Sequence, residues 1–252
     1  AALSADAEIA QRLREALASD AIALNAQPLR ALRSSAGFTA ISEILIRLSD
    51  NAGQLIPPSV LLPIAARFGL AQQVDRWVVR RVLDWLEGEH PERRRRRLYV
   101  NITASSLVDE SFVEFIASRL TGRTVPALGI EIPEHAVMLH PEAGERTIRA
   151  LEALGCGVSI DRLSGRADAI EFLAGLPVSL LKLGPEFAGM TSATDIPYVH
   201  AEAMVRIAHG LSRPVAVTGI ETQDALRCTQ TLGAELAQGV AIAPAAPLIL
   251  PS

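Results

Sequence analysis

The sequence is poor in cysteine and has no long apolar segment. Only two cysteines, Cys156 and Cys228, occur among 252 residues, and they form neither a CxxC pair nor a metal-type spacing. This pattern predicts two buried thiols in a reducing compartment. No run of about 18 apolar residues is present, so the sequence predicts no membrane span.

The charge balance gives no general attraction to polyanions. The formal net charge is −4 at pH 7, so nothing global favours a nucleic-acid polymer or an anionic membrane. A local basic run occupies residues 93–97. We expect that run to be a solvated loop before the next strand.

The N-terminal segment lacks the features of a signal peptide. Its charges are scattered, and no continuous apolar segment follows them. Ile9, Leu13 and Leu17 recur at helical spacing, which predicts an amphipathic lead-in helix within residues 1–20. Because the sequence has no initiator methionine, we expect a longer protein with a further domain upstream. No internal linker is apparent, so residues 21–252 are expected to form one domain.

The rest of the chain begins with two predicted strands and two predicted helices, and from residue 97 on strands alternate regularly with helices. Strands are predicted at residues 22–29, 38–48, 97–103, 128–134, 158–161, 179–183, 214–220 and 235–242. Helices are predicted at residues 57–70, 72–88, 109–120, 141–155, 168–176, 198–211 and 222–233. Alternating strands and helices form parallel βαβ units, and about eight strands favour a (β/α)8 TIM-like barrel. An open doubly wound sheet is the alternative, but no glycine-rich fingerprint follows the first strand.

Polar residues stand at the carboxyl ends of these strands, where barrels of this class bind ligands. Four separate strands supply oxygen donors, namely Glu43, Asn101, Glu131 and Asp161. Such a set suits a hard cation such as Mg²⁺, Mn²⁺ or Ca²⁺. The other polar strand-end residues are Gln27, Arg47, Glu134, Lys182, Thr218, Glu221 and Gln238.

An ordered set of short segments resembles the bacterial EAL domain family of cyclic di-GMP phosphodiesterases. In "SEILIRL", Glu43, Ile44 and Leu45 stand where the family has Glu-Ala-Leu. The other matching segments, in the family's order, are "QPL" (27–29), "IPPSVLLPIAARFGLAQQVDRWVV" (56–79), "YVNIT" (99–103), "IEIPE" (130–134), "LPVSLLKL" (176–183), "GIET" (219–222) and "AQGVAIAPAAPL" (237–248). The resemblance covers roughly residues 20 to 250 and implies a modified (β/α)8 barrel.

The resemblance also implies a reaction and a role for each matching residue. Two metal ions would bind one phosphodiester of cyclic di-GMP and activate a water that opens the ring to linear pGpG. The first metal would be held by Glu43, Asn101, Glu131 and Asp161. Lys182 would orient the water or the phosphate, Arg47 would contact the other phosphate, and Glu134 would hold the loop after Asp161. The remaining residues expected to face the ligand are Gln27, Leu45, Arg162, Glu221 and Gln238.

The sequence departs from the family pattern where the second metal would bind. Arg162 replaces the second of two consecutive aspartates, and Thr218 replaces a glutamate assigned to the second metal and the water. Further departures are Ala66, Leu163, Ser164, Arg166 and Gly184. A second divalent ion beside Arg162 would face like-charge repulsion, whereas a phosphate would be attracted to it. The alternative is an ion pair of Arg162 with Asp161 or Glu131, and the sequence leaves both open.

These departures leave three readings. The first is a catalytically inactive receptor for cyclic di-GMP that needs no cofactor. The second is a structural or interaction module that has lost the nucleotide, and the third is a weak phosphodiesterase with one Mg²⁺, Mn²⁺ or Ca²⁺. The resemblance further implies bacterial signal transduction of the kind that controls biofilms, in the cytoplasm. An upstream sensor or cyclase-type domain is an expected partner, while a homodimer and a membrane tether elsewhere in the protein stay open.

Overall fold

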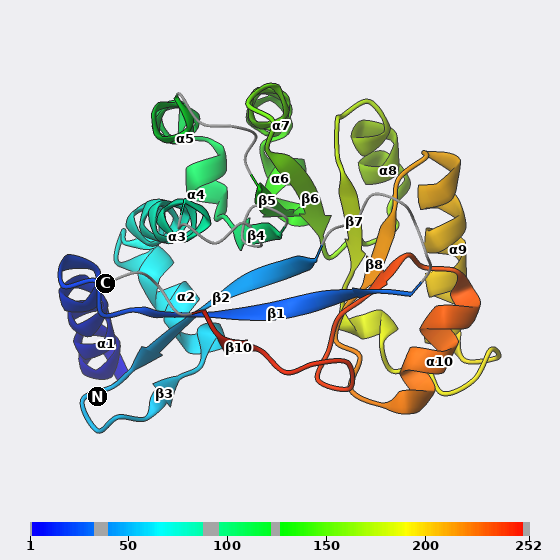
Figure 1. Ribbon diagram of the computed structural model, residues 1–252, viewed down its shortest axis with the longest axis horizontal. Helices are drawn as coiled ribbons and strands as arrows, with labels where there is room; N and C mark the ends of the chain where they lie inside the picture. Colours follow the sequence, from blue (N-terminus) through cyan, green and yellow to red (C-terminus); the bar gives the residue numbers. More distant parts are fainter. Residues whose placement is uncertain (1, 33–39, 88–95, 122–126, 249–252) are drawn as a thin grey trace.

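Eight strands close into a barrel in the computed structural model, which describes residues 2–32, 40–87, 96–121 and 127–248 (Figure 1). Around the ring the order is β1 (Ala23–Ala31), β9 (Leu236–Ala237), β8 (Val215–Val217), β7 (Leu180–Leu183), β6 (Gly157–Asp161), β5 (Leu128–Pro133), β4 (Arg97–Asn101) and β2 (Ile41–Ser49), which pairs with β1 again. Two short strands lie outside the ring: β3 (Leu55–Ile56) pairs with β2, and β10 (Ala246–Pro247) pairs with β1. The predicted barrel is therefore confirmed.

One strand of the barrel runs against the others. β1 is antiparallel to both β2 and β9, whereas the pairs from β2 through β4, β5, β6, β7 and β8 to β9 are parallel. The parallel units were predicted from the alternation of strands and helices later in the chain, and no helix was predicted between β1 and β2. Only residues 32–40 separate β1 from β2, and that span is shorter than the crossover of a dozen or more residues that a parallel pair needs.

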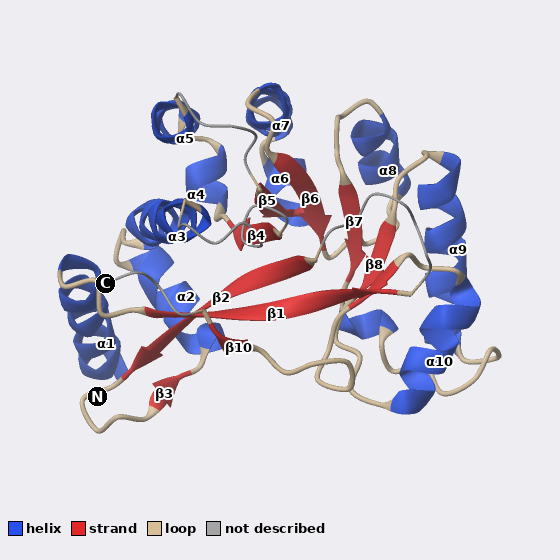
Figure 2. Ribbon diagram, viewed as in Figure 1, coloured by secondary structure: helices blue, strands red, loops and turns tan. Residues whose placement is uncertain are grey.

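Helices surround the strands on the outside of the molecule (Figure 2). Their bounds are α1 (Ala2–Ala18), α2 (Pro58–Arg67), α3 (Ala71–Leu86), α4 (Ala104–Leu107), α5 (Glu110–Leu120), α6 (Glu134–Leu139), α7 (Pro141–Ala153), α8 (Ala167–Ala174), η2 (Pro185–Phe187), α9 (Ile196–Gly210) and α10 (Gln223–Leu232). Within the described ranges, none of these helices combines the length and the apolar character that crossing a bilayer requires.

The first helix belongs to the same core as the barrel. Ala10, Leu13 and Ala16 are fully buried, and Ile9 and Leu17 pack against the core while partly buried. The helical spacing of the apolar residues in this segment thus marks the face that packs on the domain, where α1 contacts α2 and α3. A domain upstream of α1 stays a prediction.

The interior of the barrel consists of an apolar layer beneath a polar one. Six buried side chains form the apolar layer, namely Leu29, Ile41, Tyr99, Leu180, Ala216 and Leu236. Since side chains alternate between the two faces of a strand, the residue two positions away on each strand also points inward. Those residues are Gln27, Glu43, Asn101, Lys182, Thr218 and Gln238. The alternation therefore places a ring of polar groups directly above a closed apolar floor.

The boundaries of several elements differ from the predicted ones. The predicted strand 128–134 ends at Pro133, and Glu134 instead begins α6. Neither α6 nor α4 was predicted, because each is too short to show helical periodicity. Residues 38 and 39 of the second predicted strand and residues 93–95 of the basic run lie outside the described residues, while Arg97 is the first residue of β4.

A glycine makes room for the largest side chain of the apolar floor. A Cβ at Gly129 would lie 2.5 Å from Cδ1 of Tyr99, which is closer than two carbon atoms can pack. We therefore expect Gly129→Ala to lower the free energy of unfolding by about 1–3 kcal/mol, as measured by urea denaturation. Gly210→Ala is the control, because no atom lies within 4 Å of the Cβ position there. Equal stability of the two variants would contradict this packing.

Candidate functional site

Two cavities open at the carboxyl ends of the parallel strands and have one wall in common. The first cavity has a volume of about 250 Å³ and the second of about 430 Å³. The shared wall consists of Glu43, Leu45, Asp161 and Arg162. The first cavity is further lined by Gln27, Lys182, Thr218, Glu221, Gln238 and Val240, and the second by Pro58, Leu62, Asp75, Asn101, Thr103 and His135.

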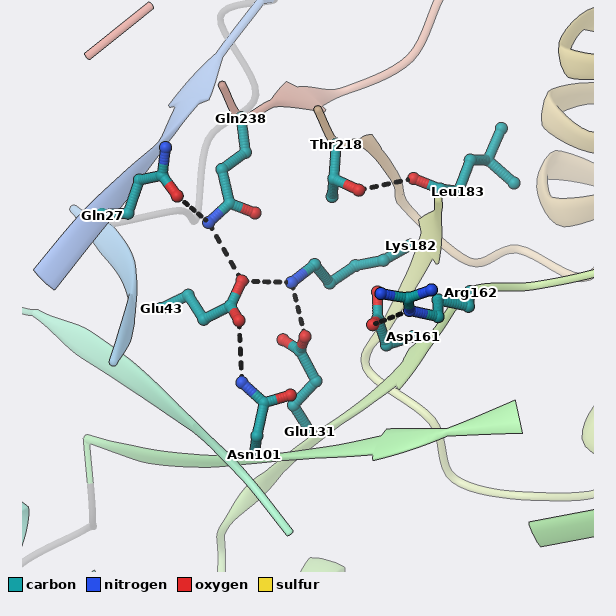
Figure 3. A network of polar contacts seen from close by, with 10 residues as sticks. All are labelled: Gln27, Glu43, Asn101, Glu131, Asp161, Arg162, Lys182, Leu183, Thr218 and Gln238. Atoms are coloured by element: carbon teal, nitrogen blue, oxygen red, sulfur yellow. Dashed lines mark hydrogen bonds and ion pairs between the residues drawn. The ribbon is translucent and has the colours of Figure 1, made fainter. Parts of the chain in front are cut away.

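Lys182 is the centre of a hydrogen-bonded network beneath the first cavity (Figure 3). Its Nζ donates to Oε2 of Glu43 at 2.7 Å and to Oε1 of Glu131 at 2.6 Å. Nδ2 of Asn101 and Nε2 of Gln238 also donate to the carboxylate of Glu43, at 2.7 and 3.0 Å. Glu131 and Lys182 are both 1% exposed, so their charges depend on one another rather than on water.

The carboxyl groups of this network differ in how readily they ionise. Burial raises the pKa of Glu131 to about 8; the ammonium of Lys182 opposes this, and the charges of Glu43 and Asp161 add to it. Burial acts in the same direction on Glu43, but Lys182 and the hydrogen bonds from Asn101 and Gln238 outweigh it, so the pKa of Glu43 is lowered. The pKa of Lys182 is raised, because the three acids outweigh its burial. Lys182 therefore stays charged, and one ammonium chiefly neutralises Glu43.

Arg162 stands at the rim of the cavities rather than in the network. Its Nε lies 3.7 Å from Oδ2 of Asp161, and its side chain is 63% exposed. Burial raises the pKa of the neighbouring Asp161. Thr218 lies across the first cavity, and its hydroxyl donates to the carbonyl oxygen of Leu183 at 2.9 Å. The hydroxyl of Thr218 is thus hydrogen-bonded to the backbone at the end of β7.

The loop after Asp161 is fastened by a carboxylate from α6. The backbone N–H and the hydroxyl of Ser164 both donate to Glu134, and the backbone bond measures 2.7 Å. Leu163 is 2% exposed, and its N–H donates to the carbonyl oxygen of Lys182 at 3.0 Å. Glu134 therefore has the loop-holding contact that the sequence suggested, although it reaches the loop from a helix.

The structure brings most of the predicted site residues together. Those that line at least one cavity are Gln27, Glu43, Leu45, Asn101, Asp161, Arg162, Lys182, Glu221 and Gln238. Glu131 lies beneath them, bonded to Lys182. Arg47 is placed differently, because its Nη1 donates to the carbonyl oxygen of Ile46 at 2.9 Å and it lines neither cavity. A phosphate contact of Arg47 stays a prediction.

Sequence reasoning missed the acid of the second cavity. Asp75 lies on the buried face of α3 and is 4% exposed. Its Oδ2 accepts from the N–H and the hydroxyl of Thr103, at 2.8 and 2.7 Å, and burial raises its pKa. The sequence feature that could have revealed Asp75 is its position as an acid within the apolar stripe of α3, which includes Val74 and Val78. Its contacts show that it fixes the turn between β4 and α4.

The described residues do not fit a pair of metal ions. Nowhere in the described ranges do three His, Cys, Asp or Glu side chains gather in positions that could hold a metal. The two carboxylates best placed for a first ion, Glu43 and Glu131, both accept from Lys182. At the second position Arg162 supplies a cation, and the hydroxyl of Thr218 bonds elsewhere. A single ion held by Glu43, Asn101, Glu131 and Asp161 stays a prediction.

Comparison with known proteins identifies the family of this barrel. A model of the EAL domain matches residues 10–245. The chain belongs to the EAL domain family. Among similar proteins, the cyclic di-GMP phosphodiesterase NbdA of Pseudomonas aeruginosa is 29% identical over 244 residues, which cover 96% of this chain and 31% of NbdA. The chain spans about a third of the length of the curated relatives it matches.

Solved EAL domains share the fold. The EAL domain of FimX from Pseudomonas aeruginosa, bound to c-di-GMP, superposes with a TM-score of 0.84 at 21% identity, covering 94% of this chain and 96% of that one. The MucR phosphodiesterase of the same organism, in a c-di-GMP complex, gives a TM-score of 0.82 at 25% identity, covering 95% and 97%. These superpositions show that the chain has the fold of solved EAL domains.

The buried ammonium should be essential for stability at alkaline pH. Lys182→Met leaves the carboxylates of Glu43 and Glu131 buried without their cation, so we expect it to lower the free energy of unfolding at pH 8 by roughly 3–5 kcal/mol. In the parent the pKa of Glu131 is already raised to about 8, so this acid binds its proton over the same pH range in both proteins. The pKa of Glu43, which Lys182 lowers in the parent, should rise above its unfolded value once the ammonium is removed. The loss should therefore shrink as the pH falls from 8 to 5 and Glu43 binds its proton.

Urea denaturation at pH 8, 6.5 and 5 measures this dependence. Arg166→Met is the control, because it removes only the exposed pair of Arg166 with Asp168 and should leave stability unchanged. A loss in Lys182→Met that stays constant across this pH range would contradict the role of Lys182 as the counter-ion.

Proposed function

We propose that this EAL domain binds cyclic di-GMP without hydrolysing it, as a receptor in bacterial signalling. The proposal rests chiefly on the two positively charged side chains of the site, Lys182 and Arg162. Lys182 already donates to the carboxyl groups of Glu43 and Glu131, and Arg162 stands where the family's second metal ligand would be. In this proposal, the side chains of Lys182 and Arg162 supply the positive charge that metal ions would otherwise bring to a phosphodiester of cyclic di-GMP.

The retained cavity walls support nucleotide binding. Gln27, Gln238 and Glu221 line the first cavity, and they offer the amide donors, amide acceptors and carboxylate that can pair with the edge of a guanine base. The FimX EAL domain and the MucR phosphodiesterase were each solved with c-di-GMP bound. By family likeness, the same ligand is the best candidate for this cavity.

The lost side chains support the absence of hydrolysis. Two-metal phosphoryl chemistry needs ions that stabilise both the attacking and the leaving oxygen. Arg162 and Thr218 cannot act as carboxylate ligands for a second ion, and the hydroxyl of Thr218 is committed to Leu183. Loss of the groups that position the nucleophile usually lowers the rate by several orders of magnitude.

One observation favours a second candidate, an interaction module that has lost the nucleotide. Arg47, the residue expected to bind a phosphate, contacts a backbone carbonyl oxygen and lies outside both cavity walls. The relatives are about three times as long as this chain. Under either candidate, the domain would act on other parts of a longer protein, which we place in the cytoplasm.

Calorimetry in EDTA, combined with a hydrolysis assay, tests the receptor. We expect the domain to bind cyclic di-GMP in EDTA and to form no pGpG when Mg²⁺ or Mn²⁺ is added, as followed by chromatography. A MucR phosphodiesterase domain serves as the positive control for the assay. Absence of binding would favour the interaction module, and metal-dependent formation of pGpG would show that the domain is an enzyme.

A further inference from the structure

Arg162 is the one residue of the shared wall that carries a positive charge. We propose that its guanidinium binds the phosphodiester of the ligand directly and so replaces a metal ion at that place. The inference rests on the proposed function and adds the group that recognises the anionic part of the ligand.

The backbone at Arg162 has a conformation that arginine rarely adopts. Its φ is +55°, and among the described non-glycine residues only Asp20 and Ser212 share a positive value. A side chain with a Cβ is strained in this region, and such strain often accompanies function. A glycine would relieve it. The arginine at this position therefore raises the free energy of the folded state, and we infer that its side chain is kept for an interaction with the ligand.

The residues on both sides hold this conformation in place. Asp161 ends β6, where it pairs with Pro133 of β5. On the other side, Leu163 is buried and bonded to Lys182, and Ser164 is bonded to Glu134. With its backbone anchored at both ends, Arg162 presents its side chain at the boundary between the two cavities.

The guanidinium at this boundary has donors to spare. Its single ion-pair partner in the described part of the chain is Asp161, at 3.7 Å, which is too long for a hydrogen bond. The other cation of the first cavity, Lys182, already donates to two carboxylates. On the same loop, Arg166 is bonded twice to Asp168. Arg162 thus combines exposure, a full charge and unused N–H groups.

A phosphodiester matches this arrangement. The planar guanidinium can donate two parallel hydrogen bonds to two phosphate oxygens. Arg162 borders both cavities. If a phosphate is bound at Arg162, the group on one side of the phosphate can enter the first cavity and the group on the other side can enter the second. Cyclic di-GMP has this form, because a base flanks its phosphodiesters on either side.

The strained backbone allows a substitution that separates binding from folding. Arg162→Gly keeps the left-handed conformation, so its melting temperature should equal or exceed that of the parent. By calorimetry in EDTA, we expect it to bind cyclic di-GMP at least about tenfold more weakly. Arg162→Lys keeps the charge but loses the paired donors, and it should bind with intermediate affinity.

A matched control and the salt dependence complete the test. Arg166→Gly removes an equal charge from the same loop and should leave the affinity unchanged, since Arg166 lines neither cavity. Between 50 and 500 mM NaCl, the affinity of Arg162→Gly should fall less than that of the parent, because the variant lacks the screened charge. A purely structural role of Arg162 would not change this salt slope.

The outcomes distinguish this inference from the proposed function. If the parent binds and Arg162→Gly binds equally well with the same salt slope, Arg162 is not a phosphate ligand, while the receptor function stands. If the parent does not bind cyclic di-GMP in EDTA, the receptor function fails and this inference fails with it. Weakened binding at an unchanged or higher melting temperature supports both.

Discussion

A single buried ammonium connects strands that no backbone hydrogen bonds join. Lys182 on β7 bonds to Glu131 on β5 and to Glu43 on β2, and none of these three strands is adjacent to another in the ring. The contacts therefore cross the interior of the barrel, where a solitary charge would be strongly disfavoured. The polar layer above the apolar floor can exist because this cation and its two acids are buried together.

The same contacts limit what the site can do. Both nearest carboxylates already share the Lys182 ammonium, and the remaining cation of the walls, Arg162, is fixed to the chain rather than exchangeable. Positive charge is thus supplied by the protein itself, at defined positions. Under the proposed receptor function, these fixed charges would recognise the anionic part of the ligand.

Part of the site followed from the strand assignments. The sequence placed Glu43, Asn101 and Lys182 at the carboxyl ends of separate strands, where barrels of this class bind ligands, and each lines a cavity there. The roles expected of these residues came from the resemblance to the EAL family. The direction of β1 did not follow from the alternating pattern, because it depends on the short span between β1 and β2.

Other features depended on contacts that a sequence pattern does not encode. The side chain of Arg47 lies on the inward face by periodicity, yet it bonds to the carbonyl oxygen of Ile46. Glu134 holds its loop from the short helix α6. The left-handed backbone of Arg162 also required coordinates, since arginine gives no local sign of that conformation.

The reversed first strand has a consequence for the order of folding. β1 is the first strand of the barrel to be made, whereas its neighbours β9 and β10 follow all the other strands, and the N–H of Leu248 donates to the carbonyl oxygen of Leu24. Gln27 and Gln238, which meet at 3.4 Å, are 211 positions apart in sequence. Contacts of such long range form slowly, since the loop entropy must be overcome before they contribute. A growing chain on the ribosome therefore cannot complete the first cavity, which Gln238 and Val240 line, until the last strands of the barrel have emerged and closed it against β1.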